Sequence, residues 1–98
     1  MPTRHREKPR AGRPKGAGSF HSASAKAFGA VVREARLHAG IAQEDLAHMS
    51  NVERSYFGRI ERGQSQPTLY LIFKVADALG YDVGEFMAVV RSRVELSG

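Results

Sequence analysis

The chain has 98 residues, of which 42% are hydrophobic and 26% charged, the size and composition of one ordinary soluble domain. It contains no cysteine, which excludes disulfide scaffolds, thiolate zinc sites and cysteine nucleophiles. No apolar run approaches the roughly 20 residues of a membrane-spanning helix, and no apolar stretch follows the basic start as in a secretory signal. We therefore expect a soluble, cytoplasmic, single-domain protein with no membrane contact.

The net charge of +5 is concentrated near the N-terminus. Residues 1–24 carry six Lys or Arg and one Glu, whereas residues 25–98 carry nine basic and nine acidic side chains. The first stretch is also rich in Pro and Gly, so it lacks the apolar surface needed to offset the entropy of ordering it. The composition predicts a disordered basic arm over residues 1–22 and a folded domain over residues 23–98.

Two roles stay open for this arm. A basic segment attracts nucleic-acid phosphates regardless of base sequence, or it serves only as a solubilising terminus. Residues 10–15 resemble the AT-hook, a minor-groove motif with the core Arg-Gly-Arg-Pro, but Ala11 separates Arg10 from Gly12. This interruption argues against minor-groove specificity of that kind.

Apolar residues recur at helical spacing from Ala25 onward, and no stretch alternates with the period of a strand. In the first helix, for example, Phe28 and Val32 lie four residues apart on one face. The predicted fold class is therefore all-α, a compact five-helix bundle. The expected helices span residues 24–39, 43–49, 53–62 and 69–79, and a fifth runs from residue 82 into the C-terminal tail.

Capping side chains and glycines mark the ends of these helices. Ala42 stands at the N-cap of the second helix and has no side-chain oxygen, which costs about 1 kcal/mol relative to Ser or Thr. Asp82 and Glu85 have the spacing of a capping box. The expected N-caps are Ser22 or Ser24, Thr68 and Asp82, and the expected C-terminal stops are Gly40, Gly63 and Gly80.

Residues 43–62 meet the physical requirements of a helix-turn-helix, two short helices fixed at a steep angle. Ala47 stands at the helix crossing, where only a small side chain fits. Asn51 makes the turn, because Asn tolerates a left-handed backbone better than most residues. The apolar contacts between the helices are expected from Leu46, Val52, Phe57 and Ile60.

The stretch from residue 28 to residue 79 resembles the Cro/C1-type (XRE-like, lambda-repressor-like) helix-turn-helix family. The resemblance covers more than half of the chain in the correct order and spacing. Two residues depart from the family pattern: Ala42 replaces the usual Ser or Thr, and Asn51 replaces the usual Gly. The matching segments are residues 28–29, 32–36, 40–47, 55–63, 67–69 and 74–80.

The resemblance implies that the helix over residues 53–62 enters the major groove of double-stranded DNA. Arg54 and Arg59 would then donate paired hydrogen bonds to guanine, and Ser55 would donate or accept one. Glu53 would accept from cytosine, or repel phosphate and so sharpen specificity, or act only as a favourable charge at the helix start. The implied phosphate contacts are Gln43, Tyr56, Gln64 and Ser65.

Several of these residues have alternative roles that the sequence leaves open. Arg59 would otherwise be a solvated charge pairing with Glu61, and Tyr56 would otherwise pack under the second helix. The family pattern also implies an ion pair between Arg36 and Glu61. No catalytic, metal-binding or cofactor-binding set is expected, since the four histidines lack ligand spacing and no catalytic motif occurs.

The resulting hypothesis is a transcriptional regulator associated with the nucleoid, a repressor that binds a palindromic operator as a homodimer. The expected dimer surface is the last helix with its tail, where Val83 and Phe86 cover the core. The residues expected to face a partner are Val89, Val90, Val94 and Leu96. The alternatives are an antitoxin with a toxin partner and autorepression, a restriction-modification controller, and a module that binds proteins instead of DNA.

Overall fold

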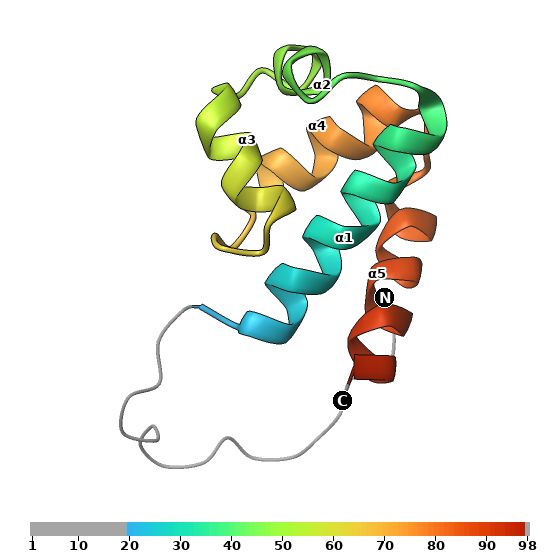
Figure 1. The fold of residues 1–98 in the computed structure, drawn as a ribbon. Helices are drawn as coiled ribbons and strands as arrows, with labels where there is room; N and C mark the ends of the chain where they lie inside the picture. The colour runs from blue at the N-terminus through green and yellow to red at the C-terminus, as the bar shows by residue number, and fades with distance from the viewer. Residues whose placement is uncertain (1–19, 98) are drawn as a thin grey trace.

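The computed structural model describes residues 20–97, which form five helices (Figure 1). They are α1 (Ser22–Ala39), α2 (Gln43–Met49), α3 (Arg54–Glu61), α4 (Leu69–Leu79) and α5 (Val83–Ser97). Residues 20–97 contain no strand, so the predicted all-α class is confirmed. Most of the expected basic arm lies outside the described residues, and its last expected residue, Ser22, already belongs to α1.

Helix α1 begins two residues earlier than the sequence predicts, because its N-cap is a histidine. The Nδ1 atom of His21 accepts a hydrogen bond from the backbone N–H of Ser24 at 3.2 Å. The backbone N–H of His21 donates to Oε1 of Gln66 at 2.6 Å, and Nε2 of Gln66 donates to Oγ of Ser24 at 3.0 Å. The start of α1 is thus held by the loop that precedes α4, 45 residues further along the chain.

The other predicted caps are present. Oγ1 of Thr68 accepts from the N–H of Leu71 at 3.1 Å, and Oδ2 of Asp82 accepts from the N–H of Glu85 at 3.0 Å. Ala42 is the N-cap of α2 and makes no side-chain capping bond. The stops Gly40, Gly63 and Gly80 have φ values of 73°, 73° and 81°, in the left-handed region that glycine adopts without strain.

Helix α1 runs through the middle of the molecule and packs against α5 and α3, while α4 contacts both α1 and α5 (Figure 1). The rings of Phe28 on α1 and Phe86 on α5 meet edge to face, with centroids 6.1 Å apart. The largest fully buried apolar side chains come from α1 to α4 and form one core: Phe28, Phe57, Leu46, Ile60, Leu71, Val32 and Val75.

Helix α5 buries more of its apolar side than expected. Val90 is only 4% exposed and belongs to the core, so the prediction that it faces a partner is wrong. Val94 is half-buried and packs against the same core, because Phe86, Val90 and Val94 recur every four residues on one stripe. Val89 and Leu96 are exposed, at 52% and 83%.

None of the helices described over residues 20–97 combines the length and the hydropathy needed to cross a membrane. Within the same range, no three acidic or histidine side chains are grouped closely enough to hold a metal ion.

Candidate nucleic-acid interface

Helices α2 and α3 are joined by a tight turn at Asn51. Asn51 has φ of 60°, as the sequence predicts, and it is the one described non-glycine residue with a positive φ. The backbone N–H of Val52 donates to the carbonyl of Ala47 at 3.0 Å, and Ala47 itself is 1% exposed. The turn and the small side chain at the crossing therefore set the angle between the two helices, as in a helix-turn-helix.

The inner side of α3 is anchored in the core. Phe57 and Ile60 are fully buried. A Cβ atom added at Gly29 on α1 would lie 2.3 Å from the carbonyl oxygen of Ile60 and 2.7 Å from that of Glu61. No side chain fits between the two backbones at this point, so α3 lies directly against α1.

A buried ion pair joins the same two helices. Nε of Arg36 donates to Oε2 of Glu61 at 2.6 Å and Nη2 donates to Oε1 at 3.0 Å, with the two side chains 9% and 2% exposed. This is the ion pair that the family resemblance implied. Nη1 of Arg36 also donates to the carbonyl of Ile41 at 2.9 Å. Because the forked guanidinium matches the carboxylate, the pair fixes the orientation of α3 relative to α1.

Gln43, the first residue of α2, joins this network. Its Nε2 atom donates to Oε1 of Glu61 at 3.0 Å, so the carboxylate of Glu61 is shared by Arg36 and Gln43. Glu61 is consequently not a partner for Arg59, the alternative that the sequence left open. One carboxylate on α3 thus holds α1 and α2 at the same time.

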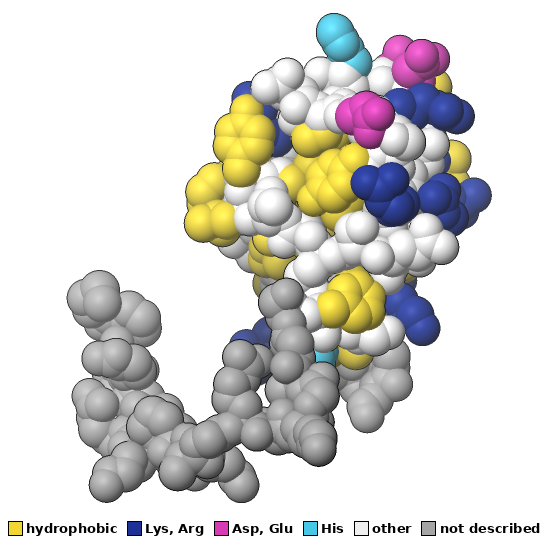
Figure 2. Space-filling view, turned by 90° about the vertical axis from the view of Figure 1, so that its left-hand side faces the viewer, with side chains coloured by type: hydrophobic (Ala, Val, Ile, Leu, Met, Phe, Trp, Pro, Cys, Tyr) yellow, Lys and Arg dark blue, Asp and Glu magenta, His cyan; other side chains and the backbone are white. Residues whose placement is uncertain are grey.

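The outer side of α3 carries polar side chains that point to solvent. Arg54, Ser55 and Arg59 are all exposed, and Ser55 and Arg59 lie four residues apart on the side opposite the buried Phe57 and Ile60. Among residues 20–97, no carboxylate forms an ion pair with Arg54 or Arg59. Figure 2 views this side of the molecule and shows several Lys and Arg side chains close together, next to hydrophobic side chains.

Glu53 is the N-cap of α3, but its side chain makes no capping hydrogen bond to the helix backbone. Its Oε1 atom accepts a hydrogen bond from Oγ of Ser55 at 2.5 Å. An acidic group therefore stands at the start of the exposed side of α3, where the helix dipole stabilises it. The hydroxyl of Ser55 is engaged with that carboxylate in the free protein.

Tyr56 occupies the border between the two sides of α3. The residue is half-buried and packs against the core. Its ring lies under the guanidinium of Arg59, with 5.6 Å between Cζ and the ring centroid. Tyr56 thus packs against the core, one of the two roles that the sequence left open for it. Its ring also lies beneath the exposed Arg59.

The remaining expected phosphate contacts lie in the loop after α3. Gln64 is exposed and Ser65 is half-buried. Oε1 of Gln64 accepts from Nε of Arg62 at 3.1 Å. Arg62 is a further exposed cation, outside the set that the family resemblance implied, and its position three residues after Arg59 places it on the same side of the helix.

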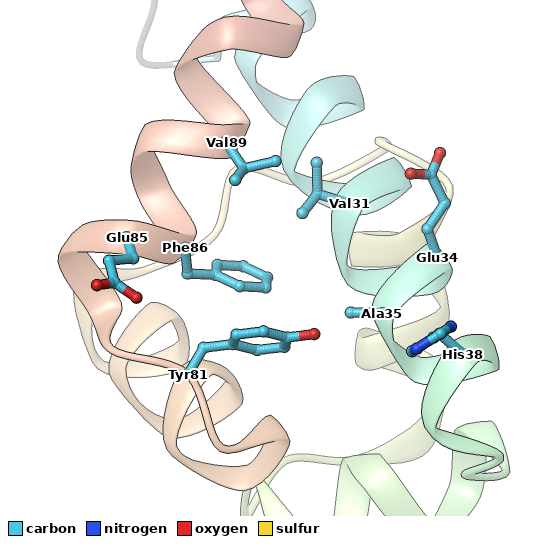
Figure 3. Close-up of a pocket in the computed structure, with 8 residues that line it drawn as sticks. All are labelled: Val31, Glu34, Ala35, His38, Tyr81, Glu85, Phe86 and Val89. Atoms are coloured by element: carbon cyan, nitrogen blue, oxygen red, sulfur yellow. The ribbon is translucent and has the colours of Figure 1, made fainter.

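A second surface lies between α1 and α5, where a groove of about 420 Å³ opens (Figure 3). The rings of Tyr81 and Phe86 extend from the α5 side into this space, and Val89 lies at its edge. Beside the groove, Arg93 of α5 donates two hydrogen bonds to the carboxylate of Glu34 on α1, at 2.8 and 3.0 Å. These hydrogen bonds lower the pKa of Glu34 and raise that of Arg93.

The chain is similar to known regulators in sequence. A helix-turn-helix family model matches residues 32–86, which is more than half of the chain. YqaF of Bacillus subtilis (strain 168), described as an uncharacterized HTH-type transcriptional regulator, is 31% identical over 51 residues. The matched region covers 52% of this chain and 67% of YqaF.

Solved structures share the fold. The restriction-modification controller protein C.AhdI from Aeromonas hydrophila is 42% identical, with a TM-score of 0.62 over 65% of this chain and 97% of the controller. The controller C.Esp1396I, solved as a tetramer with its natural 35 base-pair operator, is 26% identical, with a TM-score of 0.66 over 74% of this chain and 95% of that one. The chain therefore belongs to the Cro/C1-type helix-turn-helix family of DNA-binding transcriptional regulators.

Proposed function

We propose that this protein is a sequence-specific repressor that binds a palindromic operator as a homodimer and reads the major groove with α3. The observation that carries the proposal is the outer side of α3. Arg54, Ser55 and Arg59 are exposed there on a helix whose inner side is fixed in the core. No carboxylate among residues 20–97 pairs with either arginine, so both guanidinium groups are available to a ligand rich in acceptors.

Each exposed side chain has a role that its chemistry supports. The planar guanidinium groups of Arg54 and Arg59 match the O6 and N7 acceptors of guanine. The carboxylate of Glu53 accepts from cytosine N4 and repels phosphate, so it disfavours wrong registers on the duplex. The proposed phosphate contacts, which set register without reading bases, come from Gln43, Gln64, Ser65 and Arg62.

A homodimer follows from the small size of one reading helix. A single α3 covers only a short stretch of groove, whereas two copies about 34 Å apart read two half-sites of a palindrome. The proposed dimer surface is the outer side of α5 with the C-terminal tail. Val89 and Leu96 are the exposed apolar residues that support it, and Val90 is excluded because it lies in the core.

The test is selection of binding sites from random duplex DNA with the full-length protein, followed by sedimentation of the protein alone and on the selected site. We expect one enriched palindromic motif and a complex of two chains per site. The variant carrying Arg54→Ala and Arg59→Ala should enrich no motif, whereas the matched variant Arg33→Ala, an exposed arginine on α1, should enrich the same one. Absence of any motif with the wild-type chain contradicts the proposal.

Restriction-modification control is a second candidate function. It is favoured by the likeness to two controllers, one of them 42% identical to this chain. A controller of this kind should bind upstream of its own gene, and that gene should lie beside genes for an endonuclease and a methyltransferase. A selected motif found only at unrelated promoters argues for a general repressor.

A further inference from the structure

We propose that Tyr56 is a positioning residue for DNA reading. Its ring holds the guanidinium of Arg59 in the orientation that meets a guanine, and so sets the base preference at that position without touching the base. This inference rests on the function proposed above and assigns Tyr56 a role different from the phosphate contact that the family resemblance implied.

The geometry places the guanidinium of Arg59 over the ring of Tyr56 on the same helix. Arg59 follows Tyr56 by three residues, a spacing that makes side chains neighbours on a helix surface. The 5.6 Å between Cζ of Arg59 and the ring centroid lies within the distance at which a cation is attracted to an aromatic face. The ring is half-buried and packs against the core, whereas Arg59 is exposed. The interior therefore fixes the ring, and the ring in turn restricts the exposed arginine.

The neighbouring carboxylates do not compete for Arg59. Glu61 is bonded to Arg36 and Gln43, and Glu53 accepts from Ser55. Within residues 20–97, neither carboxylate forms an ion pair with Arg59. The contact with Tyr56 is thus what defines the direction of this guanidinium in the free protein.

The orientation of the Arg59 guanidinium matters because its proposed contact with guanine uses two hydrogen-bond donors at once. Paired bonds to O6 and N7 of guanine require the flat fork of the guanidinium to lie in the plane of the base. A freely rotating arginine loses conformational entropy when it adopts that one orientation, and an arginine already restricted by a neighbouring ring loses less. Removal of the Tyr56 ring should therefore reduce the preference for guanine at the one base pair that Arg59 reads and leave the contacts with other base pairs unchanged.

A second pair in the molecule has the same separation and serves as a control. Nζ of Lys74 lies 5.6 Å from the ring centroid of Tyr70 on α4. That ring is 54% exposed, and an ammonium group has no fork to orient. Lys74→Leu thus removes a tyrosine–cation contact of the same length from a helix that is not the reading helix, and it leaves the hydrogen bond from Asn51 to the Tyr70 hydroxyl in place.

The experiment measures the dissociation constants of the full-length chain for its selected site and for sites with each base pair replaced in turn. Arg59→Lys should reduce the preference for guanine at one position of each half-site by about tenfold. Tyr56→Leu should reduce it at the same position by roughly three- to fivefold, and Tyr56→Phe should retain it. In the Arg59→Lys background, Tyr56→Leu should have no further effect on that preference, and Lys74→Leu should leave the wild-type preference unchanged.

Two results of the binding measurements overturn the inference. One is a Tyr56→Leu variant that weakens all sequences equally, and the other is a Tyr56→Phe variant that behaves as Tyr56→Leu does, which would assign the effect to the hydroxyl. If Tyr56→Leu does not fold, NMR of the wild type decides the matter. The Hδ protons of Arg59 should be shifted upfield by the ring in the wild type and in Tyr56→Phe, and absence of that shift overturns the inference. A wild type that shows no sequence preference refutes the proposed function instead.

Discussion

The two sides of α3 differ in what their side chains contact. On the inner side, Phe57 and Ile60 are fully buried and Glu61 is bonded to two other helices. On the outer side, Ser55 and Arg59 are exposed, and their side chains respectively bond to the cap residue Glu53 and lie over the ring of Tyr56. One helix of eight residues thus carries fold stability and ligand recognition on separate side chains, so the two properties should respond to different substitutions.

The largest expected effect belongs to the inner side. Glu61→Ala leaves the buried guanidinium of Arg36 without its carboxylate, and it should lower the free energy of unfolding by about 3 to 5 kcal/mol. Urea unfolding followed by circular dichroism measures this value. Equal melting temperatures for Glu61→Ala and Arg54→Ala would contradict the division between the two sides. The double variant Arg36→Met with Glu61→Leu should recover much of the loss, because it removes both charges.

Gly29→Ala tests the contact between the α1 and α3 backbones. The new Cβ would lie 2.3 Å from the carbonyl oxygen of Ile60, so the helices must separate, and we expect a loss of about 3 kcal/mol. Gly84→Ala is the matched control, since its Cβ meets only the side-chain oxygen Oδ2 of Asp82 at 3.1 Å. The control should change stability by less than about 1 kcal/mol. Similar melting temperatures for the two variants would show that the close approach tolerates a methyl group.

Arg54→Ala tests the outer side. The variant should bind the selected operator more weakly by about 1 to 3 kcal/mol, because one paired contact to a base is lost. Its free energy of unfolding should stay within about 0.5 kcal/mol of the wild type. Fluorescence anisotropy and thermal melting measure the two quantities. A variant that loses stability and affinity together would show that the outer side also supports the fold.

Deletion of residues 1–19 tests whether the basic N-terminal segment adds attraction to DNA phosphates. If it does, the slope of log affinity against log salt should decrease by about 0.9 for every phosphate that it neutralises. Binding should weaken on all DNA sequences alike, in contrast to the base-specific effect of Arg54→Ala. Titrations at several salt concentrations measure the slope, and an unchanged slope assigns the segment no role in DNA binding.

The smallest expected effect concerns the exposed ion pair between Glu34 and Arg93. Hydrogen bonds from Arg93 lower the pKa of Glu34, so the stability this pair adds is present above the ordinary glutamate pKa and is lost as the pH falls through the lowered one. Glu34→Gln should lower the melting temperature slightly at pH 7, and the difference from the wild type should narrow by about pH 3. A difference that is constant over this range would show that the carboxylate charge is not responsible.

The sequence predicts the features that depend on local geometry. Asn51 adopts the left-handed backbone and Ala42 leaves α2 without a side-chain cap, as the sequence predicts. The helix ends at Gly40 and Gly80 are also predicted correctly, because a glycine in the left-handed conformation terminates a helix through its own backbone and needs no distant partner.

Other features depend on residues far apart in the chain and were not predicted. The cap of α1 is missed because His21 is held by Gln66, 45 residues later. The hydrogen bond from the side-chain amide of Gln43 to Glu61 joins residues 18 positions apart, and the sequence did not indicate it. Val90 was expected to face a partner chain, because helical spacing shows which residues share an apolar face but not which neighbouring helix covers that face.

The shared carboxylate of Glu61 has a consequence for the proposed DNA complex. The buried carboxylate of Glu61 links α1, α2 and α3, so the DNA-binding surface of these helices is already ordered in the free protein. We therefore expect this surface not to change shape when it binds a straight duplex. Any mismatch in curvature has to be absorbed by the DNA, so flexible base-pair steps between two half-sites should bind more tightly even though no side chain touches them.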